Sequence, residues 1–160
     1  MPKDSTAADR DTNAESFILF ELVGTSYGVR SRAVQQMEMV EHITPVPNAP
    51  AFVEGVAFSR GRVIPAINLR TRFGFEKKAH DLRTRLVVIK AGDRVAGLIV
   101  DASREFLRIP PDVIQPPPEA IAGLSGQYLE GIAALGERVI LILDVEETLN
   151  MTKYADVATE

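Results

Sequence analysis

An internal repeat constrains what this chain can fold into. The stretch FVEGVAFSRGRVIPAINL begins at position 52, and YLEGIAALGERVILILDV begins at position 128, a shift of 76 residues. Identical positions in the two copies include Glu54/Glu130, Gly55/Gly131, Arg62/Arg138, Val63/Val139 and Ile64/Ile140. Each copy has two apolar, β-branched arms around a polar turn, which predicts a β-hairpin. A repeat of this length exceeds the roughly 20 to 50 residues of a solenoid unit, so two related β subdomains are expected.

A second pair of hairpins is expected at 17–29 and 86–100, where apolar strands flank glycine-bearing turns. The segment 34–43 alternates weakly between apolar and polar residues, which favours a strand and leaves a helix as the alternative. Near the C-terminal end, Asp144 is an acceptable N-cap for a helical turn over 144–149. The fold class predicted from these patterns is all-β with short helical turns.

The domain organisation follows from polarity and periodicity. Residues 1–15 are polar without apolar periodicity, which predicts a disordered N-terminal arm. Residues 16–150 are expected to form a single domain with two subdomains, at roughly 16–80 and 81–150; that the two are intertwined is implied only by the family resemblance described below. The segment 151–160 is expected to be a loose C-terminal tail.

Composition restricts the function classes. A net charge of −4 and a pI near 5.3 argue against binding through bulk phosphate electrostatics, although a small nucleic-acid-binding β-barrel stays as an alternative. No apolar run approaches the roughly 20 residues of a spanning helix, and the first residues do not resemble a secretory signal. The chain has no cysteine, which removes disulfides and thiolate chemistry. We therefore expect a cytoplasmic protein with no direct membrane insertion.

No constellation typical of an enzyme is present. His42 and His80 lack metal-ligand spacing, and no phosphate-binding loop or nucleophile elbow occurs. Asp101 and Asp144 each follow an apolar strand, a position that suits a catalytic acid but equally a turn or a cap. The expectation is a protein-binding module without catalytic residues, cofactor or metal.

Several segments together resemble the CheW family, the coupling proteins of bacterial chemosensory arrays. They are FELVGTSYGV, VPNAP followed by FVEGVAFSRGRVIPAINLRTRFG, TRLVVIKAGDRVAGLIVDA, LRIPPDVIQPPP and YLEGIAALGERVILILDVEETL. The resemblance implies two interlocked five-stranded β-barrels without enzymatic activity. It implies a scaffold that couples the cytoplasmic tip of a chemoreceptor to the regulatory domain of a CheA-type histidine kinase, recruited to membrane receptor arrays. A CheW-like adaptor of a non-flagellar pathway, such as pilus-driven surface motility, is the alternative within the family.

The resemblance also implies contact residues, which fall into two sets. The receptor-binding positions of the family correspond to Val34, Gln36, Gly55 and Arg60, and the hairpin tip adds a partner contact at Ser59 and Arg62. The tip departs from the family's usual Asn-Leu-Arg-Gly, and Gln36 replaces a usual glutamate, which removes one possible salt bridge. Two interpretations of Arg60 stay open, a partner contact or a residue that pins a neighbouring loop; for Gly55 a close backbone approach is the structural alternative.

Overall fold

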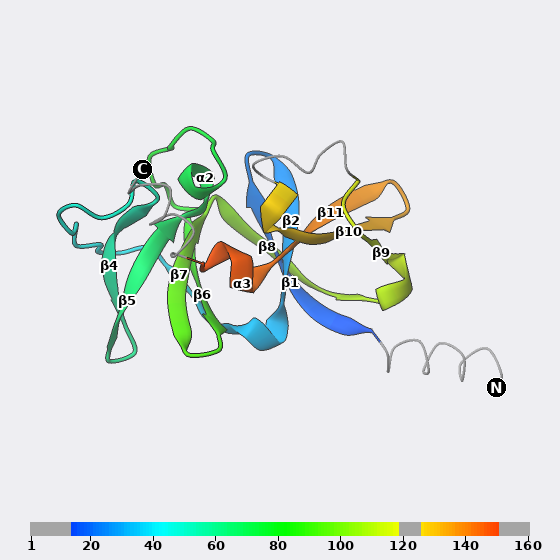
Figure 1. The fold of residues 1–160 in the computed structure, drawn as a ribbon, viewed down its shortest axis with the longest axis horizontal. Coiled ribbons are helices and arrows are strands. Elements are labelled where there is room, and N and C mark those ends of the chain that lie inside the picture. The colour runs from blue at the N-terminus through cyan, green and yellow to red at the C-terminus, as the bar shows by residue number, and fades with distance from the viewer. Residues whose placement is uncertain (1–13, 119–125, 151–160) are drawn as a thin grey trace.

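The chain folds into two mainly antiparallel β-sheets that lie side by side, as the computed structural model in Figure 1 shows. The structure describes residues 14–118 and 126–150. The six-stranded sheet has the order β8-β1-β2-β11-β10-β9, with β1 at Glu15–Leu22, β2 at Thr25–Arg30, β8 at Ala102–Ile109, β9 at Ile114–Gln115, β10 at Leu129–Leu135 and β11 at Arg138–Leu143. The five-stranded sheet has the order β3-β6-β7-β5-β4, with β3 at Val34–Met39, β4 at Val53–Ser59, β5 at Arg62–Asn68, β6 at Arg85–Ala91 and β7 at Arg94–Val100.

Short helices join or follow the strands. The 3-10 turns are η1 at Ser31–Ala33, η2 at Pro111–Val113 and η4 at Gly126–Tyr128, and the α-helical turns are α2 at Leu69–Arg72 and α3 at Val145–Thr148. The expected helical turn is therefore present, and the Asp144 side chain accepts the amide hydrogen of Glu147 as its N-cap. No helix among the described residues is long and apolar enough to cross a membrane.

The hairpin predicted for the stretch 52–69 is confirmed, and its turn is tight. β4 and β5 pair antiparallel up to Ser59–Arg62, so only Arg60 and Gly61 form the turn. Both residues have positive φ, 49° for Arg60 and 77° for Gly61. This is the conformation of a type I′ turn, whose twist matches that of the flanking strands.

The sequence repeat corresponds to a structural repeat. Asn68 and Asp144, 76 positions apart, cap α2 and α3 in the same way, each accepting a backbone amide three residues on. The backbone amide of Asn68 also donates to the Phe52 carbonyl at 2.7 Å, and that of Asp144 donates to the Tyr128 carbonyl at 2.7 Å. The two halves thus repeat hairpin, cap and helical turn.

Each sheet takes strands from both predicted subdomain segments. β5 pairs in parallel with β7, and β11 pairs in parallel with β2, so 16–80 and 81–150 contribute to both sheets. β1 begins at Glu15, and Ala14 before it is buried, so the ordered strand starts within the segment 1–15 that the sequence assigned to the arm. Residues 1–13 and 151–160 lie outside the described part, and the predictions for the arm and the tail stay predictions.

The all-β class is confirmed, whereas closure into two five-stranded barrels is not. Neither hydrogen-bonded ladder closes on itself within 14–118 and 126–150, and the sheets have six and five strands. Thr44, which follows β3, does bridge to Val56 of the opposite edge strand β4, with N···O distances of 2.9 and 2.8 Å. The five-stranded sheet therefore curls until its two edges approach at one end.

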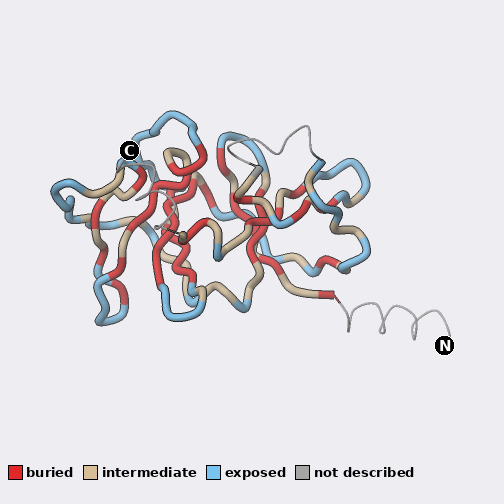
Figure 2. Tube along the Cα trace, viewed as in Figure 1, coloured by how far each residue is buried: buried red, intermediate tan, exposed pale blue. Residues whose placement is uncertain are grey.

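One core cluster joins the two sheets. It includes Phe20 and Tyr27 of the six-stranded sheet, Phe73 after α2, and Tyr128 before β10. In that order, each ring contacts the next, with centroids 5.6, 5.8 and 5.0 Å apart. Figure 2 shows the buried residues following the strands, with the exposed ones concentrated at the turns. A contiguous aromatic contact of this kind fixes the orientation of one sheet against the other.

A buried arginine reinforces the junction. Arg72 of α2 donates to the carbonyl oxygen of Thr148 in the last position of α3 at 3.2 Å and to that of Asn150 just beyond α3 at 2.9 Å. Its guanidinium lies 4.1 Å from the centroid of the Phe52 ring. Burial lowers the pKa of Arg72 below its ordinary value. Arginine nevertheless stays protonated in proteins, so this cation ties the two helical turns together.

Candidate functional site

The hairpin tip is connected to β3 by a cluster of three polar side chains. Gln36 donates from Nε2 to the Ser59 hydroxyl and to Glu38, and the Ser59 hydroxyl donates to Glu38. Ser59 is buried, so these hydrogen bonds replace its contact with water. The cluster fixes where the tip lies relative to β3.

Two exposed arginines lie beside this cluster. Gln36, Ser59, Arg60 and Arg62 line one hollow of about 210 Å³. Among the described residues, neither the Arg60 nor the Arg62 side chain forms an ion pair or a hydrogen bond, so no side-chain contact of Arg60 pins a neighbouring loop. Their guanidinium groups are available for charge-assisted hydrogen bonds to a partner.

The other two predicted receptor-binding residues lie away from the tip. Val34 begins β3, two residues before Gln36, and packs half-buried against the main core cluster. Gly55 is buried at a bulge in β4, four residues before Ser59, or about 13 Å along the strand. A Cβ on Gly55 would clash with the carbonyl oxygen of Thr44, which explains the glycine through close backbone approach.

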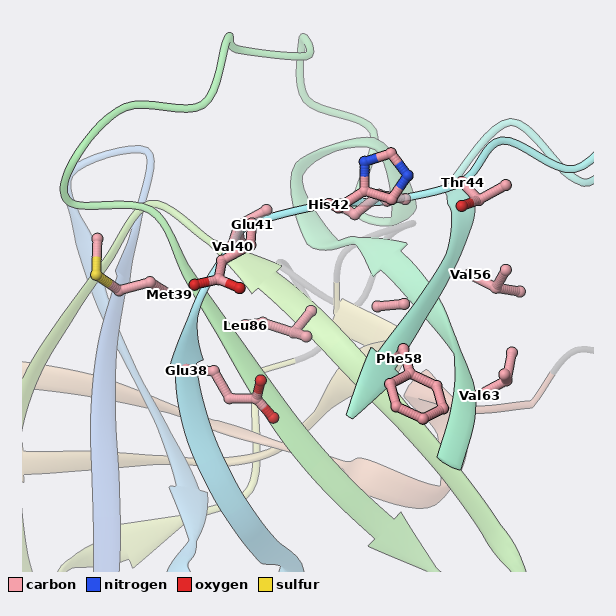
Figure 3. Close-up of a pocket in the computed structure, with 12 residues that line it drawn as sticks. Glu38, Met39, Val40, Glu41, His42, Thr44, Val56, Phe58, Val63 and Leu86 are labelled. Atoms are coloured by element: carbon pink, nitrogen blue, oxygen red, sulfur yellow. The ribbon is translucent and has the colours of Figure 1, made fainter. Parts of the chain in front are cut away.

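An apolar groove runs along the opening between the edges of the five-stranded sheet. We call it the seam groove; its volume is about 360 Å³ and it is lined by Glu38, Met39, Val40, Glu41, His42, Ile43, Thr44, Val56, Ala57, Phe58, Val63 and Leu86. Figure 3 shows Leu86 between the β3 side and the β4–β5 side. Phe58 and Val63 are cross-strand partners on this face, 72% and 62% exposed. Large apolar side chains exposed together mark an interaction surface.

This groove was not predicted from the sequence. Phe58 and Val63 belong to the apolar arms of the predicted hairpin, and that prediction does not separate the inward face of the arms from the outward face. The signal was available, because side chains alternate across a strand and Ala57 and Ile64 already fill the inner face.

The titratable candidates have structural roles. Arg70 binds both carboxylate oxygens of Asp101 at 2.7 and 2.8 Å. Burial acts to raise the pKa of Asp101, but the hydrogen bonds from Arg70 and from the Val23 amide outweigh it, and the pKa lies below its ordinary value. His80 contacts Glu54 at 3.2 Å, and His42 lines the seam groove. Asp101 and Asp144 therefore serve as an ion-pair partner and a cap.

Comparison with known proteins decides the family. The family model described as "CheW-like domain" matches residues 16–153. The chain belongs to the CheW family. CheW proteins are non-catalytic scaffold or adaptor proteins, which selects the adaptor interpretation over a nucleic-acid-binding barrel.

Individual relatives cover nearly the whole chain. The Klebsiella aerogenes "Chemotaxis protein CheW" is 33% identical over 91% of this chain and 87% of its own length. "Protein FrzA" of Myxococcus xanthus is 29% identical over 99% of both chains. The crystal structure of the scaffolding protein TtCheW from Thermoanaerobacter tengcongensis superposes with a TM-score of 0.76 and 32% identity, covering 82% of this chain and 85% of that one.

Proposed function

We propose that this chain is a non-catalytic adaptor that couples the cytoplasmic tip of a chemoreceptor to the regulatory domain of a CheA-type histidine kinase. The observation that carries the proposal is the hairpin β4–β5, which presents the unpaired Arg60 and Arg62 at its tip and the exposed Phe58 and Val63 along its outer face. An adaptor needs two surfaces that bind different partners, and this fold offers a polar and an apolar one side by side.

The polar surface is proposed to bind the receptor. It comprises Gln36 and Arg60, with Val34 further along β3. Gln36 stands where the family usually has a glutamate, and its side chain donates to Ser59 and to Glu38. Glu38, two residues further along β3, therefore supplies a negative charge beside Gln36. Gly55 is proposed to act indirectly, by allowing the close contact with Thr44 that shapes β4.

The apolar surface is proposed to bind the kinase domain, with Ser59 and Arg62 at its polar end. A standard interface buries about 800 Å² per partner, with an apolar centre and a polar rim. The seam groove supplies the apolar centre, and the hairpin tip supplies part of the rim. Binding to receptor and kinase together would recruit the chain to membrane receptor arrays, where avidity offsets modest single affinities.

We infer that 16–150 acts as one domain whose two sheets each approach a barrel. The support is the Thr44–Val56 bridge in one sheet and its counterpart in the other, where β9 pairs with β10 through Gln115 and Ile132. Val56 and Ile132 are 76 positions apart, so the two closures occupy the same place in the repeat.

Calorimetric titration against the isolated kinase regulatory domain and against a receptor-tip fragment from the same cell tests the assignment of surfaces. Phe58→Ser is expected to weaken kinase binding at least tenfold and to leave receptor binding unchanged. Arg60→Ala is expected to do the reverse. Val139→Ser, at the corresponding outer face of the second hairpin, is the matched control and should change neither affinity. If Phe58→Ser binds the kinase domain as the parent does, the assignment is wrong.

A further inference from the structure

The two halves of the chain pair their strands in the same register. Glu38 of β3 lies opposite Leu86 of β6, and Leu107 of β8 lies opposite Phe17 of β1, so the counterparts are 69 positions apart in both strands. The same shift relates further pairs on both sides of the bulge in each ladder: Met39↔Arg85 with Arg108↔Ser16, Met37↔Val87 with Phe106↔Ile18, and Val34↔Ile89 with Ser103↔Phe20. Each residue of β3 therefore has a counterpart in β8.

A salt bridge at the second hairpin has no equivalent at the first. Arg138, the counterpart of Arg62 in the sequence repeat, pairs with Glu105 of β8. The counterpart of Glu105 in β3 is Gln36, a neutral side chain that cannot form an ion pair with an arginine. The same arginine therefore has a carboxylate partner within its own chain in one half and faces a neutral amide in the other.

No other carboxylate replaces the missing partner of Arg62. Glu38 is the carboxylate that hydrogen-bonds to the neighbouring side chains, and it accepts from Gln36 and Ser59. Within 14–118 and 126–150 the Arg62 side chain forms neither an ion pair nor a hydrogen bond. Arg62 is exposed, so its guanidinium group is free to bind a partner.

The hollow beside Arg62 favours a carboxylate as its occupant. Its charged lining residues are Arg60 and Arg62, and its volume is about 210 Å³. Its apolar lining residues belong to a buried core cluster and are Ile64, Val88 and Val95. Apolar walls exclude water, which strengthens a charge-assisted hydrogen bond between a guanidinium group and a carboxylate.

The charges around the hollow do not cancel its two guanidinium groups. Glu38 supplies one negative charge through its contact with Gln36. The turn between β6 and β7 supplies Lys90, Asp93 and Arg94, which together carry one positive charge. The surroundings of the hollow therefore have an excess of positive charge, which favours an acidic partner surface over a basic one.

We propose that Arg62 binds a carboxylate side chain of the kinase regulatory domain in this hollow. Gln36 determines this specificity, because it leaves Arg62 without an ion-pair partner in its own chain. The carboxylate of the kinase domain then takes the position on Arg62 that Glu105 has on Arg138. This inference rests on the proposed function, which assigns Arg62 to the kinase surface, and it names the chemistry that Arg62 recognises.

Calorimetric titration of the full chain with the isolated kinase regulatory domain tests the proposal. Arg62→Gln should weaken binding roughly five- to tenfold, since one charge-assisted contact is lost. It should also reduce the loss of affinity when salt is raised from about 0.1 to about 1 M. Gln36→Glu should weaken binding to a similar degree, because the new carboxylate pairs with Arg62. In the Arg62→Gln background, Gln36→Glu should have no further effect.

Glu105→Gln is the matched control. It leaves Arg138 unpaired in the same way as Arg62, but the hairpins β4–β5 and β10–β11 lie at opposite ends of the molecule (Figure 1). Binding to the kinase domain should therefore equal that of the parent.

The side-chain Nε–Hε resonances of the arginines, measured by NMR on the free chain, test the pairing without a partner. In Gln36→Glu the resonance of Arg62 should move towards that of Arg138 in the parent. In Glu105→Gln the resonance of Arg138 should move in the opposite direction, towards that of Arg62. An Arg62 resonance that Gln36→Glu leaves unchanged would contradict the proposal.

The titration separates two kinds of failure. If the parent does not bind the kinase domain, the adaptor function and this inference fail together. If the parent binds and Arg62→Gln binds equally tightly, only this inference fails. It also fails if Gln36→Glu weakens binding as much in the Arg62→Gln background as in the parent, because the effect would then not pass through Arg62.

Discussion

Replacing Arg60 by glycine separates the contribution of the hairpin tip to folding from its contribution to binding. Arg60 has φ 49°, in the left-handed region, which costs an L-residue roughly 1–2 kcal/mol. Glycine avoids that cost but loses about 0.5–1 kcal/mol of backbone entropy on folding. Since the Arg60 side chain has no hydrogen bond or ion pair within the described residues, no such contact is lost. The net expectation is stabilisation by about 0.5–1 kcal/mol.

The assay is thermal and urea unfolding of the parent, Arg60→Gly and Arg60→Ala. In a domain of this size 1 kcal/mol corresponds to roughly 2–4 °C, so Arg60→Gly should melt about 1–4 °C higher. Arg60→Ala keeps the strained φ and should melt close to the parent. Both variants should lose receptor affinity. Destabilisation by about 1 kcal/mol or more in both variants would refute the reasoning, because it would mean that the Arg60 side chain holds the fold together.

Three further perturbations follow from the packing. Gly55→Ala brings a methyl group against the Thr44 carbonyl and should lower the free energy of unfolding in urea by about 3 kcal/mol. Gly136→Ala is the control, because Gly136 also has a positive φ but has open space around it, so a larger loss in Gly55→Ala reports the crowding. Arg72→Met removes the cation that donates to carbonyl oxygens at the end of α3 and should lower the free energy of unfolding by about 3 kcal/mol. Faster amide hydrogen exchange at Thr148 would locate the loss at this helical turn. The lowered pKa of Asp101 means that its contribution to stability is present above the unfolded-state pKa and is lost as pH falls through the lower folded-state pKa. Asp101→Asn should therefore make the free energy of unfolding fall less steeply below about pH 4 than in the parent. An equally steep fall in the parent and in Asp101→Asn would contradict this.

Local pattern was sufficient to predict the hairpins but not their arrangement. The turn at Arg60–Gly61 and the strand β3 follow from short-range alternation and turn residues. The parallel pairs β5–β7 and β2–β11 join strands far apart in sequence, and hydrophobic alternation does not record which strand lies beside which. The interleaving of both sheets came instead from the family resemblance.

The candidate site was predictable only in part, for a related reason. Ser59, Arg60 and Arg62 are neighbours in sequence, so their proximity at the tip follows from the hairpin alone. Contact of Ser59 with Gln36 requires β3 and β4 to become the two edges of one curled sheet. That curvature is a property of the whole sheet and also creates the seam groove, which is why the sequence did not indicate it.

Reconstitution of kinase control is the most direct test of the adaptor function. The measurement is the rate of autophosphorylation of the CheA-type kinase from the same cell, mixed with receptor cytoplasmic fragments on vesicles, with and without this chain. The account predicts that the rate depends on the receptor only when the chain is present, and that Phe58→Ser abolishes this dependence without lowering the unfolding midpoint. Receptor control of the kinase that is equal with and without the chain would contradict the account.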